Sequence, residues 1–324
     1  MFLYTTNKVI SQLKSIFLLT LFFFLGRVKK MKIAYQIIAL VCLICVNGVC
    51  SADDDLWAIA FYTYWAQYSM PADAIDFEAV THVAHFCMNP STNGDLDRSY
   101  FTDQQIRNTV KIVHDAGRKI LITIGEAGSG SKFQAATTDA NRAKFISQIV
   151  DAVQKYGYDG VDIDWEASGD PGSKFTVFIK ELHQAMNDVN PNWLLTADVA
   201  PYSHAPKTMA EVADEIDSFN TMTYWSSLNV HIEPYMDAGI PASKLTGGVG
   251  LGDDGGIDTT PEKVRIKLEY AKQMGLRGIM MWEIDDIYRK STEQGIYDVI
   301  KEYVSPPGPT APTAPKNFHV IHPS

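Results

Sequence analysis

The stretch YDGVDIDWE, from Tyr158 to Glu166, has the pattern of a buried β-strand but carries four acidic residues. Successive side chains of a strand point to opposite faces, so Asp162, Asp164 and Glu166 share one face. The opposite face carries Val161, Ile163 and Trp165. Burying like charges together is costly unless they share protons, accept hydrogen bonds or meet a cation. The acids are therefore either solvated or used in chemistry.

Short β-rich segments recur between Trp57 and Tyr303 and alternate with longer amphipathic segments. This alternation is typical of βα units around a parallel sheet. Eight strands over about 250 residues predict an α/β protein of the (β/α)8 TIM barrel class. The expected strands are Trp57–Tyr62, His82–Met88, Lys119–Gly125, Gly160–Glu166, Leu194–Ala200, Ser218–Tyr224, Lys244–Gly250 and Gly278–Glu283.

Helical segments are expected in most of the links between these strands. The helical pattern is weakest in the first link and in the sixth. The expected helices are Asp103–Ala116, Asp139–Tyr156, Ser173–Val189, Thr208–Glu215 and Pro261–Met274.

The bulk composition is that of a globular protein. The chain has 324 residues, of which 46% are hydrophobic and 20% are charged, so it can build a large core. Its formal net charge of -10 and its pI near 5.2 argue against a nucleic-acid or anionic-membrane partner, because both attract basic surfaces. A neutral substrate is compatible with this charge.

The N-terminal region carries two apolar segments. Residues 1–30 include the apolar run Ile16–Leu25 and form an upstream segment, for which one interpretation is an over-extended start. Residues 31–52 have the features of a signal peptide, with Lys32 as the positive start and Ile37–Val46 as the apolar core. We therefore expect a secreted, extracellular protein without a stable membrane anchor. The alternative is a pair of membrane helices, although both runs are short for the ~20 residues that a span needs.

Only one of the four cysteines, Cys87, lies in the expected mature chain, so no internal disulfide is predicted there. Residues 53–304 would form the barrel domain and rely on its core for stability. Residues 305–324 begin with a proline-rich run, which can build neither a helix nor a central strand. They are expected to be a linker, and PTAPKNFHV near their end resembles the opening strand of a fibronectin type III module.

The height of each acid along its strand matters, because active sites of such barrels lie at the carboxyl ends of the strands. Glu166 is the last acid, and Asp164 and Asp162 lie below it on the same face. Crowding and burial should raise the proton affinity of at least one of them and leave a protonated carboxyl available as a general acid. The alternatives are a solvated strand face or a divalent-metal site, since carboxylates bind hard cations.

The motif DGVDIDWE matches in full the Asp-x-x-Asp-x-Asp-x-Glu pattern of glycoside hydrolase family 18, the chitinases and their relatives. Other segments follow in the order of that family: AFYTYW in the first strand, ITIGEAG in the third, MTY in the sixth and MMWE in the eighth. The resemblance covers Trp57 to about Tyr303. It implies a glycosidase that cleaves β-1,4 linkages between N-acetylglucosamine units, with no metal and no cofactor.

The same resemblance assigns roles to individual residues. Glu166 would protonate the glycosidic oxygen, and Asp164 would orient the acetamide group of the substrate. Asp162 would share a proton with Asp164, and Tyr224 would hydrogen-bond the acetamide. Trp282, at the end of the eighth strand, would form the floor under the sugar at the cleavage point.

Further substrate-binding side chains are expected around this floor, and they are Phe61, Phe86, Met222 and Trp225. The sequence also departs from the family pattern in two places. The usual Ser-x-Gly-Gly of the third strand is GEAG, with Glu126 and Ala127, and Trp225 stands where an Asp or Asn commonly follows the tyrosine. The segment Gly252–Arg277 leaves no room for the α+β insertion of some relatives, so we expect a compact barrel with a shallower cleft.

Several of these residues have structural alternatives. His82 lies on the opposite strand face from His85 and Cys87, so structural roles are favoured over a metal site. Trp282 and Tyr224 could be barrel core, although their positions at strand ends favour function.

Three classes of function are compatible with the motif. They are a chitinase, an endo-β-N-acetylglucosaminidase that acts on N-glycans, and a non-catalytic chitin-binding lectin. Glu166 disfavours the lectin, because such relatives typically lose this acid. The motif DIDWE and the trailing linker favour chitin over N-glycans. We expect a monomer that binds chitin or N-acetylglucosamine oligosaccharides and no nucleic acid.

Overall fold

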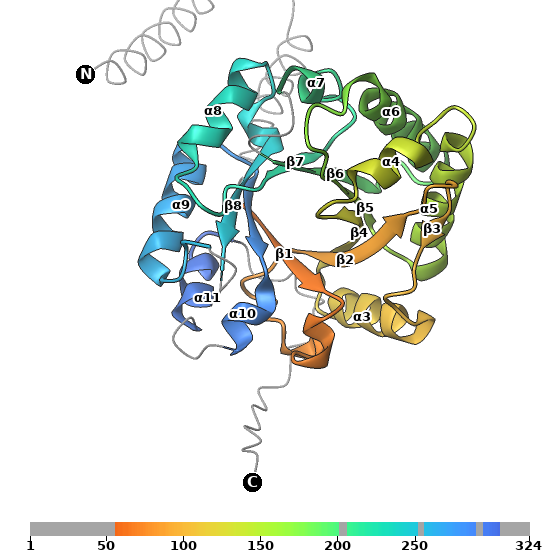
Figure 1. The fold of residues 1–324 in the computed structure, drawn as a ribbon. Coiled ribbons are helices and arrows are strands. Elements are labelled where there is room, and N and C mark those ends of the chain that lie inside the picture. The colour runs from red at the N-terminus through yellow and green to blue at the C-terminus, as the bar shows by residue number, and fades with distance from the viewer. Residues whose placement is uncertain (1–55, 201–205, 252–255, 290–293, 305–324) are drawn as a thin grey trace, which may run out of the picture. The chain divides into compact units, whose positions relative to one another are not determined.

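Eight parallel strands close on one another into a barrel, which confirms the predicted fold (Figure 1). β1 pairs with β2 on one side and with β9 on the other, and these contacts close the ring. A further short strand, β3 (Leu96–Asp97), pairs antiparallel with the end of β2. The barrel strands are β1 (Trp57–Thr63), β2 (His82–Pro90), β4 (Lys119–Glu126), β5 (Gly160–Trp165), β6 (Leu194–Val199), β7 (Ser218–Thr221), β8 (Leu245–Gly250) and β9 (Gly278–Trp282).

The structure is a computed structural model that describes residues 56–200, 206–251, 256–289 and 294–304. The predictions for the upstream segment 1–30, the signal peptide 31–52 and the linker 305–324 fall outside these ranges. Within them, no helix combines the length and the apolar character needed to cross a membrane.

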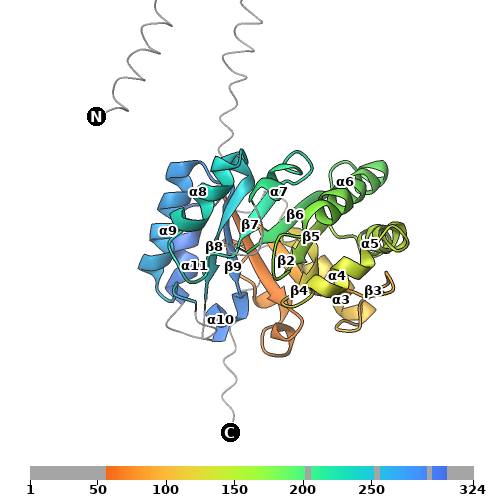
Figure 2. The ribbon, with the colours of Figure 1, turned by 45° about the horizontal axis from the view of Figure 1, so that its top comes forward.

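The helices lie outside the ring of strands in both views (Figure 1 and Figure 2). They are α3 (Asp103–Asp115), α4 (Gly130–Ala136), α5 (Arg142–Tyr156), α6 (Gly172–Val189), α7 (Pro206–Ala210), α8 (Asn229–Asp237), α9 (Pro261–Met274), α10 (Ile284–Arg289) and α11 (Gln294–Lys301). The first link, between β1 and β2, contains only the short 3-10 turns η1 (Ala66–Tyr68) and η2 (Ala72–Ala74). Between β8 and β9 the described residues form one helix, α9, in keeping with the expected compact barrel.

Three predicted boundaries are wrong by three residues or more. The helix expected from Asp139 begins only at Arg142. The helix expected over Thr208–Glu215 ends at Ala210 and is followed by turns. Acidic residues at positions 211, 214 and 215 would occupy the last turn of the longer helix, where its dipole disfavours negative charge. β7 ends at Thr221 rather than Tyr224, because the hydroxyl of Thr223 donates to Gly248 O at 3.1 Å and accepts from Gly248 N at 2.8 Å in place of ladder bonds.

The two faces of β5 have different surroundings, as the alternation of its residues predicts. On the outer face, Trp165 stacks on Phe133 of α4 with 4.7 Å between ring centroids. On the inner face, Asp162 and Asp164 are buried inside the barrel. Burial of both faces is typical of a parallel strand covered by helices. The helical layer therefore fixes which way the acids point.

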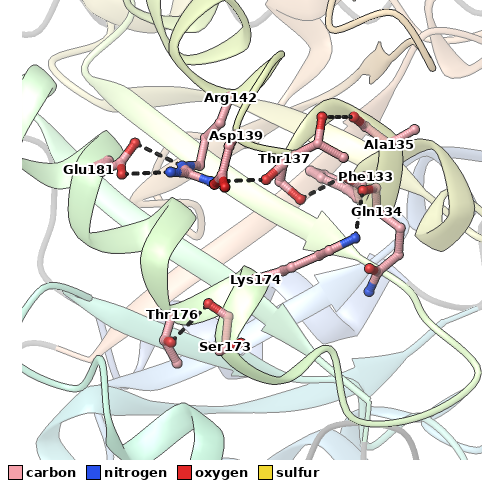
Figure 3. A network of polar contacts seen from close by, with 11 residues as sticks. Phe133, Gln134, Ala135, Thr137, Asp139, Arg142, Ser173, Lys174, Thr176 and Glu181 are labelled. Atoms are coloured by element: carbon pink, nitrogen blue, oxygen red, sulfur yellow. Dashed lines mark hydrogen bonds and ion pairs between the residues drawn. The ribbon is translucent and has the colours of Figure 1, made fainter.

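The helices outside β5 are tied together by polar contacts (Figure 3). Arg142 at the start of α5 binds both carboxylate oxygens of Glu181 on α6, at 2.8 and 3.0 Å, and also binds Asp139 at 2.8 Å. Lys174 of α6 donates to the carbonyl of Gln134 on α4 at 3.1 Å. These contacts hold α4, α5 and α6 as one layer against the strand that carries the acids.

A glycine allows β4 to approach β5 beside Asp164. Gly125 has a φ of +114°, and a Cβ built on it would lie 1.9 Å from the Asp164 carbonyl oxygen. No residue with a side chain fits there without moving one of the two strands. Gly125 therefore contributes to the height at which Asp164 enters the barrel.

A buried ion pair joins the ends of β7 and β8 to α9. Lys267 of α9 binds Asp258 at 2.6 Å, and it also donates to the carbonyl oxygens of Thr223 and Gly248 at 2.8 and 2.7 Å. Asp258 in turn accepts from Gly250 N at 2.9 Å. Every donor of the ammonium group has a partner, so the charge is satisfied although it is buried.

Lys267→Met should reduce the free energy of unfolding by about 3–5 kcal/mol, because it leaves Asp258 buried without its partner. Urea unfolding monitored by circular dichroism measures the loss. The double variant Lys267→Met/Asp258→Asn also removes the unpaired charge of Asp258 and should recover part of the stability. A double variant no more stable than Lys267→Met would contradict this account.

Candidate active site

Three acids of β5 rise toward the carboxyl ends of the barrel strands. Asp162 and Asp164 are 1% and 4% exposed, whereas Glu166, directly after the strand, is half-buried. Burial raises the pKa of Glu166 above its ordinary value. The arrangement agrees with the sequence, which places Glu166 at the top of the acids.

Asp162, the lowest acid, is held by side chains from three neighbouring strands. Its Oδ2 accepts from Thr123 Oγ1 of β4 at 3.0 Å. Its Oδ1 accepts from Thr196 Oγ1 of β6 at 2.5 Å and from Asn220 Nδ2 of β7 at 3.1 Å. Burial raises the pKa of Asp162, and these donors act in the opposite direction because they favour the carboxylate.

Asp164, the middle acid, is less well satisfied. Its Oδ1 is buried and has no hydrogen-bond partner. Burial raises the pKa of Asp164 well above its usual range, and the charges of Glu166, Asp162 and Glu126 raise it further. A buried oxygen without a donor is costly, so this atom is prepared to accept a hydrogen bond from a bound molecule.

A cavity of about 280 Å³ opens above these acids. All but one of the residues predicted for the site line it, and they are Glu166, Asp164, Tyr224, Trp282, Phe61, Phe86, Met222 and Trp225. Asp162 does not line the cavity but lies beneath it. The two sequence departures, Glu126 and Ala127, also line it.

An aromatic cluster forms one wall of the cavity. Trp282 lies 5.0 Å from Phe86 and 5.6 Å from Phe61, measured between ring centroids. Trp65 lies 6.0 Å from Trp282, and its indole Nε1 donates to Glu283 Oε1 at 3.0 Å. Burial raises the pKa of Glu283 to about 7. Faces of aromatic rings provide a flat apolar surface for the apolar face of a ligand.

Tyr224 and Trp225 point in different directions. Tyr224 is 7% exposed, and its hydroxyl contacts Met280 Sδ at 3.3 Å. Trp225 lines the cavity but is 58% exposed. The residue after Tyr224 therefore brings an exposed aromatic ring to the rim and no carboxylate to the interior.

The two histidines of β2 have partners within the barrel. His82 stacks on Trp57 at 4.0 Å, and His85 Nδ1 hydrogen-bonds Tyr158 OH at 2.7 Å. Burial lowers the pKa of each histidine to about 3, which keeps both rings neutral. Among the residues that the structure describes, no cluster of His, Cys, Asp and Glu could hold a metal ion.

Sequence reasoning missed several residues of the site. Asp198 of β6 lines the cavity and is 4% exposed. It is an acid on the inward face near the carboxyl end of a strand, so the criterion that singled out Asp164 would have found it. Thr123 and Asn220 carry no such signal, because polar residues in strands are common. Trp65 lies outside any strand, and its place in the wall depends on how the chain folds after β1.

Comparison with known proteins gives a consistent result. A model of the glycosyl hydrolases family 18 matches residues 58–251, which is more than half of the chain. Endochitinase 1 of Metarhizium anisopliae is 21% identical over 336 residues, covering 69% of this chain and 79% of the relative. Chitinase A1 of Niallia circulans is 30% identical over 189 residues, covering 42% of this chain and 27% of the relative.

Solved structures share the fold. A chitinase from Rhizomucor miehei has a TM-score of 0.65 at 21% identity and covers 76% of this chain and 99% of its own. A family 18 chitinase from Cycas revoluta, solved in complex with (GlcNAc)3, has a TM-score of 0.66 at 17% identity with the same coverage. The match to the family model over residues 58–251, together with the complete acidic motif, shows that the chain belongs to family 18 of the glycosyl hydrolases and is a glycosidase.

Proposed function

We propose that this glycosidase hydrolyses β-1,4 linkages between N-acetylglucosamine units of chitin or its oligosaccharides, with retention of configuration and with help from the substrate's own acetamide group. The predicted signal peptide at residues 31–52 makes export part of the same proposal. The observation that carries the mechanism is the buried, unpartnered Oδ1 of Asp164 directly below Glu166. An acetamide N–H is a donor of the right kind for that oxygen.

Glu166 acts as the general acid. Its carboxyl carries a raised pKa and lines the cavity, so it can hold a proton for the leaving glycosidic oxygen. As this proton is transferred, the bond between the anomeric carbon and the glycosidic oxygen breaks. After the leaving group departs, the Glu166 carboxylate can accept a proton from the attacking water.

The acetamide acts as the nucleophile. Its carbonyl oxygen attacks the anomeric carbon and forms a cyclic oxazolinium ion, as in the substrate-assisted exceptions among retaining glycosidases. Positive charge develops on the amide nitrogen, and Asp164 accepts the N–H and stabilises that charge. The hydroxyl of Tyr224 can donate to the acetamide oxygen. Asp162 supports this arrangement from beneath.

The named relatives support chitin as the substrate, and the aromatic wall supports a carbohydrate. The ring centroids of Trp282, Phe61 and Phe86 lie within 6.0 Å of one another. All three rings line the cavity that contains Glu166. The rings can pack against the apolar face of a pyranose while the acids address its acetamide and its linkage.

Glu166→Gln should lower kcat on chitooligosaccharides by at least about 10²-fold, because a general acid typically contributes ~10² to 10⁴-fold. In the wild type, activity should fall as the pH rises through the raised pKa of Glu166, since only the protonated carboxyl donates. A pH series of kcat/KM measures both effects, with the exposed Glu269→Gln as the matched control. Turnover of folded Glu166→Gln within a few-fold of wild type would disprove the role.

Trp282→Ala should raise KM by about tenfold, a loss of ~1.4 kcal/mol in binding, because the sugar loses its flat apolar surface. Trp193→Ala, which removes an indole packed against the core away from the cavity, is the control. Michaelis constants and melting temperatures of both variants separate the roles. A lower melting temperature of Trp282→Ala with an unchanged KM would show that Trp282 is only core.

The first product should be the β-anomer, and cleavage should require an N-acetyl group on the sugar at the cleavage point. Anomer-resolved NMR on partly deacetylated chitin observes both outcomes in one experiment. An initial α-anomer, or efficient cleavage after a glucosamine unit, would rule out the acetamide mechanism. Release of intact N-glycans from glycoproteins without attack on chitin would favour the endo-β-N-acetylglucosaminidase instead.

A further inference from the structure

Asp198 is a second buried acid at the height of Asp164. Asp162 of β5 is paired with Thr196 of β6, so two residues further along the strands Asp164 and Asp198 follow side by side. Both carboxyl groups line the cavity, and both are 4% exposed. Each of the two has a buried Oδ1 without a hydrogen-bond partner. Asp198 therefore faces the cavity as Asp164 does.

Asp198 also lies close to Asp162: it follows Thr196 by two residues on β6 and pairs with Asn220 of β7, and both Thr196 and Asn220 bind Asp162. Two carboxyl groups can share a hydrogen bond only if one of them carries a proton. Asp162 already accepts from the hydroxyls of Thr123 and Thr196 and from the amide of Asn220. These three donors favour the charged form of Asp162. The proton of the pair therefore belongs on Asp198.

The orientation of Asn220 strengthens this assignment. Its Oδ1 accepts from Ser218 Oγ at 3.2 Å and from Thr246 Oγ1 at 3.0 Å. The amide is thus fixed with its Nδ2 toward Asp162, where it can only donate. Asp162 has to be an acceptor to satisfy this donor.

The charges around Asp198 point in the same direction. The titratable groups that face it are Asp162 and Asp164 of β5 and Tyr224 after β7. Among the described residues that line the cavity, none is Lys, Arg or His. Burial raises the pKa of Asp198 well above its usual range, the charges of Asp162 and Asp164 raise it further, and only the amide of Asn220 acts in the opposite direction. An ionised Asp198 would have no counter-charge among the described residues that line the cavity.

We propose that Asp198 is a further substrate-contacting residue that works as a neutral carboxylic acid: its O–H donates to Asp162, and its free Oδ1 accepts a hydrogen bond from a hydroxyl or amide N–H of the bound N-acetylglucosamine unit. The identity of the sugar rests on the proposed function. The family resemblance assigns Asp164 as the residue that shares a proton with Asp162. In this proposal Asp198 has that role instead. Asp164 is left free for the acetamide.

The pair Asp198→Asn and Asp198→Ala tests this assignment. Asparagine retains a donor for Asp162 and a carbonyl oxygen for the cavity, so kcat/KM on chitooligosaccharides should fall by no more than about fivefold. Alanine removes both, and kcat/KM should fall by about 10²-fold, the usual effect of losing one aligned polar group at a reacting centre. The exposed Asp151 of α5, changed to Asn and to Ala, is the matched control for each substitution.

The pH profile separates a neutral acid from a charged one. If Asp198 is neutral, Asp198→Asn removes no charge, and both limbs of the kcat/KM profile stay in place. If Asp198 is ionised, its replacement removes a negative charge beside Asp164 and Glu166, and the limbs move to lower pH. A shift of the limbs, an asparagine variant as impaired as the alanine variant, or an alanine variant within about threefold of wild type would overturn the proposal.

Infrared difference spectroscopy tests the proton without using activity. At neutral pH the wild type should show the C=O band of a protonated carboxyl that Asp198→Asn lacks and Asp151→Asn retains. This result would stand even if the protein cleaved no chitooligosaccharide, so failure of the proposed function is distinguishable from failure of this assignment. An unchanged band in Asp198→Asn would show that Asp198 carries no proton and would overturn it.

Discussion

The site depends on one buried carboxylate, Asp162, and on the donors that three neighbouring strands direct at it. Thr123, Thr196 and Asn220 surround its two oxygens at 2.5 to 3.1 Å. A carboxylate in the middle of a barrel is tolerable only with such partners, because burial otherwise removes its charge. The position of Asp162 sets the depth in the barrel at which Asp164 and Asp198 lie. The oxygens of these two acids that lack a hydrogen-bond partner face the cavity.

Apolar and polar side chains are buried in different parts of the barrel. Large side chains such as Trp165 and Phe133 pack between strands and helices. The interior end toward the cavity holds acids on one side and the cluster of Phe61, Phe86 and Trp282 on the other. A sugar has both polar and apolar faces, so this division matches the chemistry of the proposed ligand. The same division leaves several acids close together, and no Lys, Arg or His is among the described residues that line the cavity.

Acids placed close together can take different chemical roles when the surroundings of each carboxyl group differ. Asp162 has three hydrogen-bond donors, Asp198 lies beside the charge of Asp162, and Asp164 has a buried oxygen without a hydrogen-bond partner. Glu166 is only half-buried and lines the cavity. Four similar carboxyl groups can thus hold different protonation states at one pH, because their surroundings differ. General acid catalysis needs one of them protonated while acetamide binding needs another to accept.

The sequence by itself determined the barrel, the order of its strands and the inward stripe of Asp162, Asp164 and Glu166, because these follow from local alternation and from one dense motif. It also placed Trp282 and Tyr224 at the cavity through their positions near strand ends. Only the tertiary structure decided that Asp198, from a different strand, lies beside Asp162 and Asp164, and that Trp65 joins the aromatic wall. The reason is that register between strands and the path of the loops bring together residues far apart in the chain, and no local pattern encodes those distances.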